Sequence, residues 1–242
     1  MDRTKNEHKA FYLKDLYYNL IKDEQTDLDH MINYKIIEKE NGISKIERET
    51  QINRNLIYSD KYLKAIYSLQ ESMDCKREIV SASREILEHR NGTKFEDLYY
   101  IDTLHNNSVM KQINYDIEFT VKPTEKMEKA LIDNDGIIAL HNHPKSSLPS
   151  INDFHICDEK NYKYGLILCH NGTIYRYKTI GELNYTNISC SISIFDKEEY
   201  DSLINLQTRE DVSNAHKEHI TELTKNLMDA GVLFEEVLWN EK

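Results

Sequence analysis

Apolar residues in the N-terminal third of the chain recur at the spacing of amphipathic helices. The first predicted helix carries its apolar stripe at Phe11, Leu13, Leu16, Tyr17, Leu20 and Ile21. Residues 58–69 and 76–90 repeat the pattern, and Gly92 follows at the position of a helix C-terminal cap. We therefore predict a polar, helical region whose stripes pack into a core. The alternative use of these stripes is a docking arm for a substrate or partner.

Beyond Gly92 the pattern changes to short apolar runs separated by turn residues. Residues 98–102 and 109–120 predict a β-hairpin, and residues 164–169 and 173–178 predict a second hairpin across Asn171-Gly172. Between the hairpins we expect a helix at residues 125–133, a strand at residues 137–140 and a helix from Ser150 to about residue 162. This order predicts an α+β fold in which helices pack on a central mixed sheet.

The C-terminal quarter is predicted to be mainly helical. Residues 184–195 have a weak strand pattern, and residues 196–229 have apolar residues at helical spacing. A short apolar segment follows at residues 233–239. We expect a C-terminal helix docked on the core, with an exposed partner-binding tail as the alternative.

Composition narrows the class of protein. Charged residues make up 30% of the chain, and with 7 Gly and 3 Pro it suits a helix-rich protein with few long loops. The net charge of −11 argues against nucleic acid as a partner, because phosphate backbones would be repelled. The 4 cysteines show no Cys-x-x-Cys spacing, and we find neither a signal-peptide core nor an apolar run of about 18 residues. We predict a cytoplasmic protein with no membrane segment.

The strongest chemical pattern lies where the apolar run 137–140 ends in His-Asn-His-Pro. Residues i and i+2 of a strand point to the same face, so His141 and His143 present two imidazoles side by side. Ser150 then begins the next helix as its N-cap, with Asp153 three residues later. Two neutral imidazoles and one carboxylate leave a fourth position open on a zinc ion, which is the arrangement of a catalytic site.

This pattern, His-x-His-Pro followed by Ser-x-x-Asp, resembles that of the JAMM (MPN+, JAB-type) zinc metallopeptidases, and His-Asn-His-Pro is most similar to their prokaryotic, RadC-like and phage-type branch. The loop between His143 and Ser150 is one residue shorter than the usual spacing. The resemblance covers roughly residues 87–179. It implies Zn²⁺ bound by His141, His143 and Asp153, and hydrolysis of peptide or isopeptide bonds. The domains we expect are a helical N-terminal extension at 1–80, a JAB/MPN-like core at 81–182 and a C-terminal helical segment at 183–242.

The resemblance also implies a glutamate, near the start of the first strand, that moves protons to and from the metal-bound water. Glu88 at a helix end and Glu96 just before strand 98–102 compete for this role. We favour Glu96 because it can reach the sheet edge, whereas Glu88 suits an exposed helical position. Ser150 has two candidate tasks. It can cap the helix, which stabilises the fold by about 1 kcal/mol. It can also donate a hydrogen bond to the developing oxyanion, as the corresponding serine does in the family that the motif resembles.

Neighbouring polar residues are expected to be secondary. His155 and Asp158 follow the helix start, so we expect them outside the ligand set or on the surface. Asn142 is a candidate for orienting the loop, whereas His105 and His170 have no assigned task.

Three functions are open from the sequence. The leading one is a zinc-dependent hydrolase acting on a protein or peptide substrate. The alternative keeps the fold and a structural metal but has no catalysis, as in a phage- or immunity-associated binding or assembly module. An intact Glu beside an open metal position distinguishes the two. The third is metal-dependent phosphoester hydrolysis, against which the acidic balance argues. The pattern leaves the substrate and the oligomeric state open.

Overall fold

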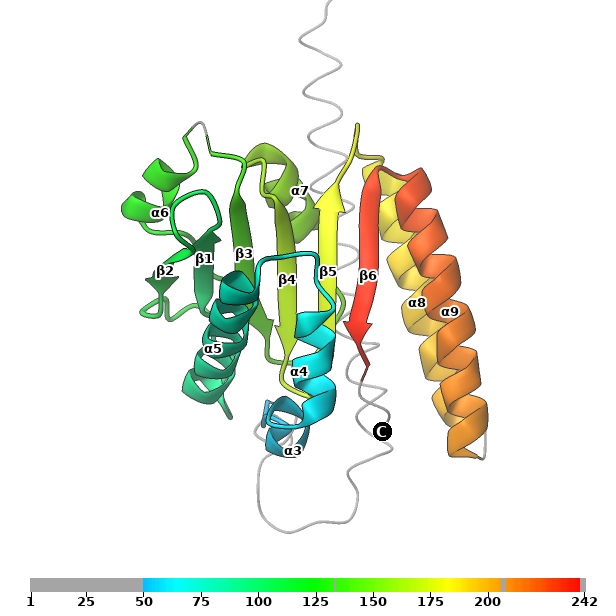
Figure 1. Ribbon diagram of the computed structural model, residues 1–242. Coiled ribbons are helices and arrows are strands. Elements are labelled where there is room, and N and C mark those ends of the chain that lie inside the picture. The colour runs from blue at the N-terminus through cyan, green and yellow to red at the C-terminus, as the bar shows by residue number, and fades with distance from the viewer. Residues whose placement is uncertain (1–49, 133, 206–207, 240–242) are drawn as a thin grey trace, which may run out of the picture. The chain divides into compact units, whose positions relative to one another are not determined.

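The computed structural model describes residues 50–132, 134–205 and 208–239 of the chain. A six-stranded mixed sheet lies between helices, which confirms the predicted α+β class (Figure 1). The described elements follow one another in this order: α3 (Arg54–Ile57), α4 (Asp60–Tyr67), α5 (Met73–Arg90), β1 (Leu98–Asp102), β2 (Ser108–Gln112), α6 (Glu125–Ala130), β3 (Ile137–His143), α7 (Ile151–Glu159), β4 (Tyr164–Cys169), β5 (Ile174–Thr179), α8 (Tyr185–Asn205), α9 (Arg209–Asp229) and β6 (Val232–Leu238).

The strands lie in the order β2-β1-β3-β4-β5-β6. β3 and β4 are parallel, and the chain passes between them through α7, as a parallel pair requires a crossover connection. The other neighbouring strands are antiparallel. β3 is buried along its whole length at the middle of the sheet, so side chains on both of its faces lie inside the protein.

The two faces of the sheet carry different helices. Ile138 and Leu140 of β3 belong to the core cluster that includes α4 and α5, whereas Ile137 and Ala139 belong to the cluster that includes α7, α8 and α9. Figure 1 shows α4 and α5 in front of the sheet and α7 behind it. Ile138 and Leu140 are 0% exposed, and burying each side chain contributes roughly 1.5–3 kcal/mol. We name the two sides the α5 face and the α7 face.

Residues 50–80 supply α3, α4 and the first turns of α5 on the α5 face. Ser59 and Ser72 cap α4 and α5 by accepting hydrogen bonds from backbone N–H groups in the first turn of each helix. α5 ends at Arg90, and Gly92 adopts the positive φ of 73° expected for a residue after a helix C-terminus. The helix predicted at residues 11–21 lies outside the described residues.

Both predicted hairpins are present. β1 pairs with β2, but the second strand ends at Gln112 rather than near residue 120, and beyond it Glu118 forms an isolated bridge with Phe95. β4 and β5 pair across Asn171-Gly172, where Gly172 has a φ of 96°. The helix predicted at residues 125–133 ends at Ala130. α7 ends at Glu159, three residues before the predicted end.

The C-terminal quarter differs from its prediction in two places. Residues 184–195 are predicted as a weak strand, but from Tyr185 onward they form the first half of α8, in which the Ser191 hydroxyl donates to the carbonyl of Asn187. The apolar segment at residues 233–239 contributes to β6, which pairs with β5 and extends the sheet. α8 and α9 are each 21 residues long. No helix in the described ranges is both long enough and apolar enough to cross a membrane.

Candidate metal centre

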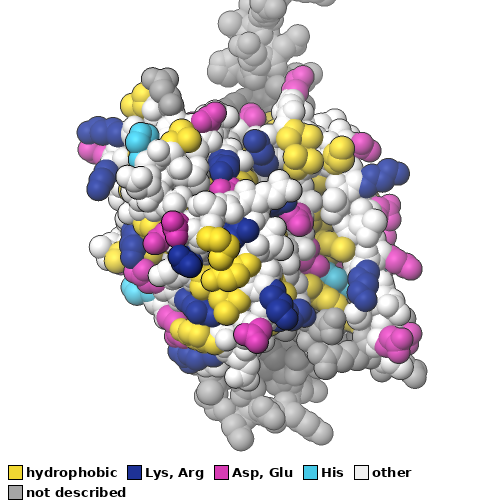
Figure 2. Space-filling view, viewed as in Figure 1, with side chains coloured by type: hydrophobic (Ala, Val, Ile, Leu, Met, Phe, Trp, Pro, Cys, Tyr) yellow, Lys and Arg dark blue, Asp and Glu magenta, His cyan; other side chains and the backbone are white. Residues whose placement is uncertain are grey.

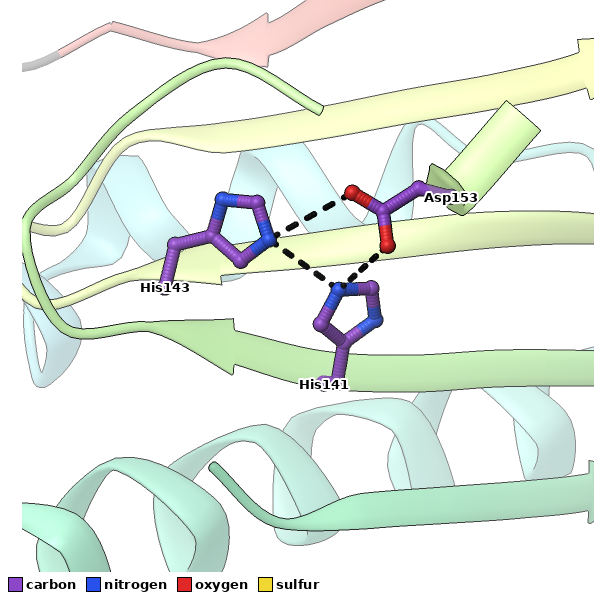
Figure 3. A group of neighbouring side chains, drawn as sticks. All are labelled: His141, His143 and Asp153. Atoms are coloured by element: carbon purple, nitrogen blue, oxygen red, sulfur yellow. Dashed lines mark hydrogen bonds and ion pairs between the residues drawn. The ribbon is translucent and has the colours of Figure 1, made fainter. Parts of the chain in front are cut away.

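His141 and His143 lie at the C-terminal end of β3 and project from its α7 face (Figure 3). Strand alternation places them on the same side as Ile137 and Ala139, as the sequence predicts. They are 6% and 7% exposed, because β1 and β4 flank β3 on either side. The two imidazoles are therefore held on a central strand, close to where it meets the following loop.

Asp153 comes from the first turn of α7. Ser150 is the N-cap of this helix, and the two residues form a capping box, as predicted. The Oδ2 atom of Asp153 accepts hydrogen bonds from the backbone N–H of Ser150 at 2.6 Å and from its hydroxyl at 2.8 Å. The cap thus fixes the rotamer of Asp153, whose side chain is 13% exposed and faces the histidines.

The three side chains converge with the spacing of metal ligands. The Nε2 atoms of His141 and His143 are 3.1 Å apart, and Asp153 Oδ1 lies 3.2 Å from His141 Nε2. Asp153 Oδ2 lies 3.6 Å from His143 Nε2. Atoms bound tetrahedrally at zinc distances of about 2.0–2.1 Å lie about 3.3 Å from one another. The donor set and its spacing fit one small divalent cation.

Ser147, in the loop before α7, contacts the Nδ1 atom of His143 in two ways. Its carbonyl oxygen and its hydroxyl each lie 3.1 Å from Nδ1. With the proton on Nδ1, which the carbonyl accepts, Nε2 keeps a free lone pair directed at His141 and Asp153. A partner on the far nitrogen is what metal-binding histidines in proteins usually have.

The charges of the cluster are mutually dependent. Burial alone would raise the pKa of Asp153, but His141, His143 and the hydrogen bonds to the carboxylate lower it below its usual range. Burial lowers the pKa of His143 to about 4, with His141 adding to the effect. Burial opposes protonation of His141 too, yet Asp153 and Glu96 raise its pKa. The buried carboxylate therefore requires a positive partner, which a proton on His141 or a bound cation supplies.

Glu96 lies on the loop that leads into β1, two residues before Leu98. Leu98 belongs to the core on the α7 face, and strand alternation continued by two residues brings Glu96 to the same face, just beyond the last β1–β3 pair at Leu98 and His141. The residue is 7% exposed, and burial raises the pKa of its carboxyl to about 8, with His141 opposing and Asp153 adding to the rise. The influence of both ligands on this pKa is consistent with a carboxyl beside the cluster.

Glu88 lies on the other side of the sheet. It belongs to the last turn of α5, and its carboxylate accepts a hydrogen bond from Arg54 at 2.7 Å and another from the Tyr58 hydroxyl. The hydrogen bond from Arg54 lowers the pKa of Glu88. The sheet stands between α5 and the α7 face, which separates Glu88 from the cluster.

Other polar residues near the motif lie outside the ligand group. His155 contacts the Tyr185 hydroxyl through Nδ1 and lies 3.7 Å from Glu159. Asn142 and His170, both 0% exposed, contact each other on the α5 face, and sequence reasoning did not connect them. Alternation along β3 gives the face of Asn142, but no local signal identifies its partners. Among the described residues, His141, His143 and Asp153 form the group whose ligand atoms lie within 4.8 Å of one another.

Comparison with known proteins adds no relative, since no family model, no curated protein and no solved structure matches this chain.

Proposed function

We propose that this protein is a zinc-dependent hydrolase of peptide or isopeptide bonds, of the JAMM type that its motif resembles. One observation carries the proposal. Two imidazole nitrogens and a carboxylate converge at 3.1–3.6 Å on the face of the sheet where the buried Glu96 also lies. Three protein ligands with a carboxyl beside them match a metal site that keeps one position for water.

A zinc ion held there would supply a Lewis acid and would lower the pKa of a bound water toward about 7. His141 and His143 would bind it through Nε2, and Asp153 would bind it through its carboxylate. The capping box and the Ser147 carbonyl keep Asp153 and His143 in orientation. This division of tasks accounts for each polar contact of the three ligands named above.

Glu96 moves the proton in this proposal. A buried carboxyl with a pKa of about 8 exchanges a proton readily near neutral pH. The positive charge of a bound cation would favour its carboxylate form, which accepts a proton from the water and returns it to the leaving amine. Glu88 does not fit the task, because Arg54 holds its carboxylate on the α5 face.

Ser150 has a second task in the proposal. Its hydroxyl donates to Asp153 and so lies next to the ligand set, at an exposed position. From there the hydroxyl can turn to donate to the oxyanion that forms at the scissile carbonyl. Capping of α7 and stabilisation of the oxyanion then use the same hydroxyl in different states.

The partner we propose is a protein or peptide rather than a nucleic acid, and the compartment is the cytoplasm. The net charge is −11, and on the face drawn in Figure 2 the basic side chains alternate with acidic ones. All four cysteines are free thiols, with Cys75, Cys157 and Cys169 buried. Reduced thiols are what a reducing compartment maintains.

Metal content and turnover test the proposal together. Purified protein should bind one zinc ion per chain, measured by elemental mass spectrometry, and His141→Ala with His143→Ala should abolish binding. Cleavage is measured with a library of internally quenched peptides and with branched peptides that join a glycine carboxyl to a lysine side chain. Glu96→Gln should keep the zinc and reduce turnover by about 10²–10⁴-fold.

Glu88→Gln is the matched control. Like Glu96, Glu88 precedes the two histidines in the sequence, but its carboxylate lies on the α5 face. It should leave both zinc and turnover unchanged. Protein without stoichiometric metal contradicts the proposal. Zinc-bound protein that cleaves no peptide of either kind, with turnover indifferent to Glu96, supports a binding module with a structural metal instead.

A further inference from the structure

Asn142 lies between the two metal-ligand histidines, but strand alternation turns its side chain to the α5 face. Its amide oxygen accepts a hydrogen bond from the backbone N–H of Asp97 at 2.8 Å. Its amide nitrogen donates to the backbone carbonyl of Phe95 at 3.1 Å. These two backbone groups flank Glu96. One side chain of β3 therefore binds both ends of the short peptide that carries Glu96.

The contact between Asn142 and the Glu96 peptide lies just beyond the end of the β1–β3 ladder. The β1–β3 ladder pairs residues 98–102 with residues 137–141 and has its last pair at Leu98 and His141. Glu96 lies just beyond that pair, so main-chain pairing with β3 does not hold it. The Asn142 side chain supplies the missing link with two hydrogen bonds of ordinary length. It takes the place of the next step of the ladder.

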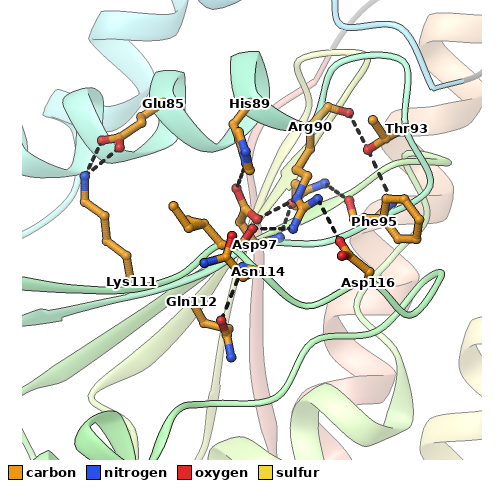
Figure 4. Close-up of polar contacts among 12 residues, drawn as sticks. Glu85, His89, Arg90, Thr93, Phe95, Asp97, Lys111, Gln112, Asn114 and Asp116 are labelled. Atoms are coloured by element: carbon orange, nitrogen blue, oxygen red, sulfur yellow. Dashed lines mark hydrogen bonds and ion pairs between the residues drawn. The ribbon is translucent and has the colours of Figure 1, made fainter.

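The same peptide is tied on its other sides. The Asp97 carboxylate accepts from Arg90 at 2.5 Å and contacts His89 at 2.7 Å, both on α5 (Figure 4). Phe95 pairs with Glu118 in the isolated bridge. These contacts anchor the peptide to α5 and to the segment after β2. Among its described hydrogen bonds, those to Asn142 tie it to the strand that carries the histidines.

His170 orients the Asn142 amide. His170 Nδ1 contacts the carbonyl oxygen of Thr50, which can only accept, so Nδ1 carries the proton. His170 Nε2 is then an acceptor, and it lies 3.0 Å from the Asn142 amide nitrogen. The two hydrogens of that nitrogen are matched by Phe95 and His170, while the oxygen faces the N–H of Asp97. A flipped amide would oppose donor to donor and acceptor to acceptor.

We infer that Asn142, oriented by His170, is a positioning residue that holds Glu96 in register with His141 and His143. Its catalytic consequence rests on the proposed function, whereas the link between Asn142 and the Glu96 peptide does not. Proton transfer requires heavy atoms about 2.6–3.2 Å apart, and a misplacement of about 1 Å can cost about 10²-fold in rate. Asn142 thus acts on the rate through Glu96.

Amide hydrogen exchange of the metal-free protein tests the link without any activity. Asn142→Ala should speed exchange in residues 94–98 by about tenfold, as expected when a buried hydrogen bond is lost. Asn134→Ala is the matched control. Asn134 is a buried asparagine that donates to the Asp102 carboxylate and accepts from the Gly136 N–H at the other end of the same two strands. Exchange in residues 94–98 that is the same in Asn142→Ala as in wild type would overturn the inference.

A pair of His170 variants tests the orienting contact and replaces Asn142→Ala if that variant does not fold. His170→Ala should also speed exchange in residues 94–98, because the Asn142 amide loses its acceptor. His170→Gln should restore most of the protection, since its amide oxygen can reach the position of Nε2. Equal exchange in His170→Ala and wild type would remove His170 from the inference.

Kinetics of the zinc-bound protein on the peptide library complete the test. Asn142→Ala should lower kcat by about 10²-fold with KM and zinc affinity unchanged. Added to Glu96→Gln it should cause no further loss, because a residue that acts through Glu96 has nothing left to position. Wild-type protein without zinc or cleavage would refute the proposed function alone. Cleavage with an unchanged kcat in Asn142→Ala would refute the positioning role alone.

Discussion

Within the described part of the chain, histidines and carboxylates meet at two buried places whose geometries differ. In the metal cluster, defined by His141, His143 and Asp153, two imidazole Nε2 atoms lie 3.1 Å apart. In the His216 cluster, defined by Glu199, His216 and Glu236, one imidazole lies between two carboxylates. His216 Nδ1 is 2.9 Å from Glu199, and His216 Nε2 is 3.0 Å from Glu236.

The difference lies in where the ring nitrogens point. Both nitrogens of His216 face carboxylates, so both donate and the ring is an imidazolium. Burial opposes this charge, but the two glutamates raise the pKa of His216 to about 9. Trp239 stacks on the ring with centroids 4.0 Å apart. The His216 cluster therefore joins α8, α9 and β6 through a charge, whereas in the metal cluster the Nε2 atoms of both histidines and the carboxylate of Asp153 converge on one point. The direction of the ring nitrogens, rather than the composition of the cluster, separates a structural ion pair from a candidate metal site.

The largest expected effect is the loss of unfolding free energy in His216→Leu. Loss of the imidazolium leaves two carboxylates facing an apolar side chain, and breaking a buried pair costs about 3–5 kcal/mol of unfolding free energy. Urea denaturation measures the loss. Zinc binding at the metal cluster should be unchanged. A loss below about 1 kcal/mol would show that the His216 cluster is as weak as a surface ion pair.

The second effect concerns pH. The folded-state pKa of His216 is about 9 against an ordinary value of 6.5, so the stabilisation is complete below pH 6.5 and is lost as pH rises through 9. Wild-type protein should lose about 3 kcal/mol relative to His216→Leu between about pH 6 and about pH 9.5. Urea denaturation of both proteins at the two values gives the difference. A constant difference would contradict the assigned charge.

The third effect is that of zinc itself. Free zinc at about 100 times its Kd should raise the unfolding free energy by about 2.7 kcal/mol, because it binds the folded state. A chelator or His141→Ala should remove the gain, which thermal unfolding with and without zinc measures. His219→Ala alters a histidine that contacts Glu199 instead. If His219→Ala also removed the stabilisation by zinc, the metal would bind at the His216 cluster and not at the metal cluster.

The smallest effect separates the two tasks of Ser150. Ser150→Ala should cost about 1 kcal/mol through loss of the α7 cap, and in the proposed mechanism it should also reduce turnover. Thr124 caps α6 by accepting from the N–H of Met127, so Thr124→Ala is a matched control. It should cost a similar amount and leave turnover unchanged. Equal turnover in both variants would show that Ser150 caps α7 and does not stabilise the oxyanion.

The errors in the sequence predictions came from competition between local preference and packing. Residues 184–195 are rich in Ser and Ile, which compete with helices or favour strands. In α8, however, Ile188 and Phe195 are seven residues apart and both enter the α7-face core. The local pattern predicts only a short apolar segment at residues 233–239, but pairing with β5 makes Val232–Leu238 a strand. Local propensity contains no information about such a partner.

The sequence by itself was enough to bring the candidate ligand group together, because each step of that inference is local. Strand alternation brings His141 and His143 together, and a capping box orients Asp153 within four residues of the helix start. Only the tertiary structure decided the surroundings. Packing of α5 on one side of the sheet keeps Glu88 on the α5 face, whereas strand alternation ahead of β1 turns Glu96 to the α7 face. The pairing of β1 with β3 brings Asn142 to the Glu96 peptide. These relations join residues about 45 positions apart, and the register of a sheet depends on contacts that no short window of sequence contains.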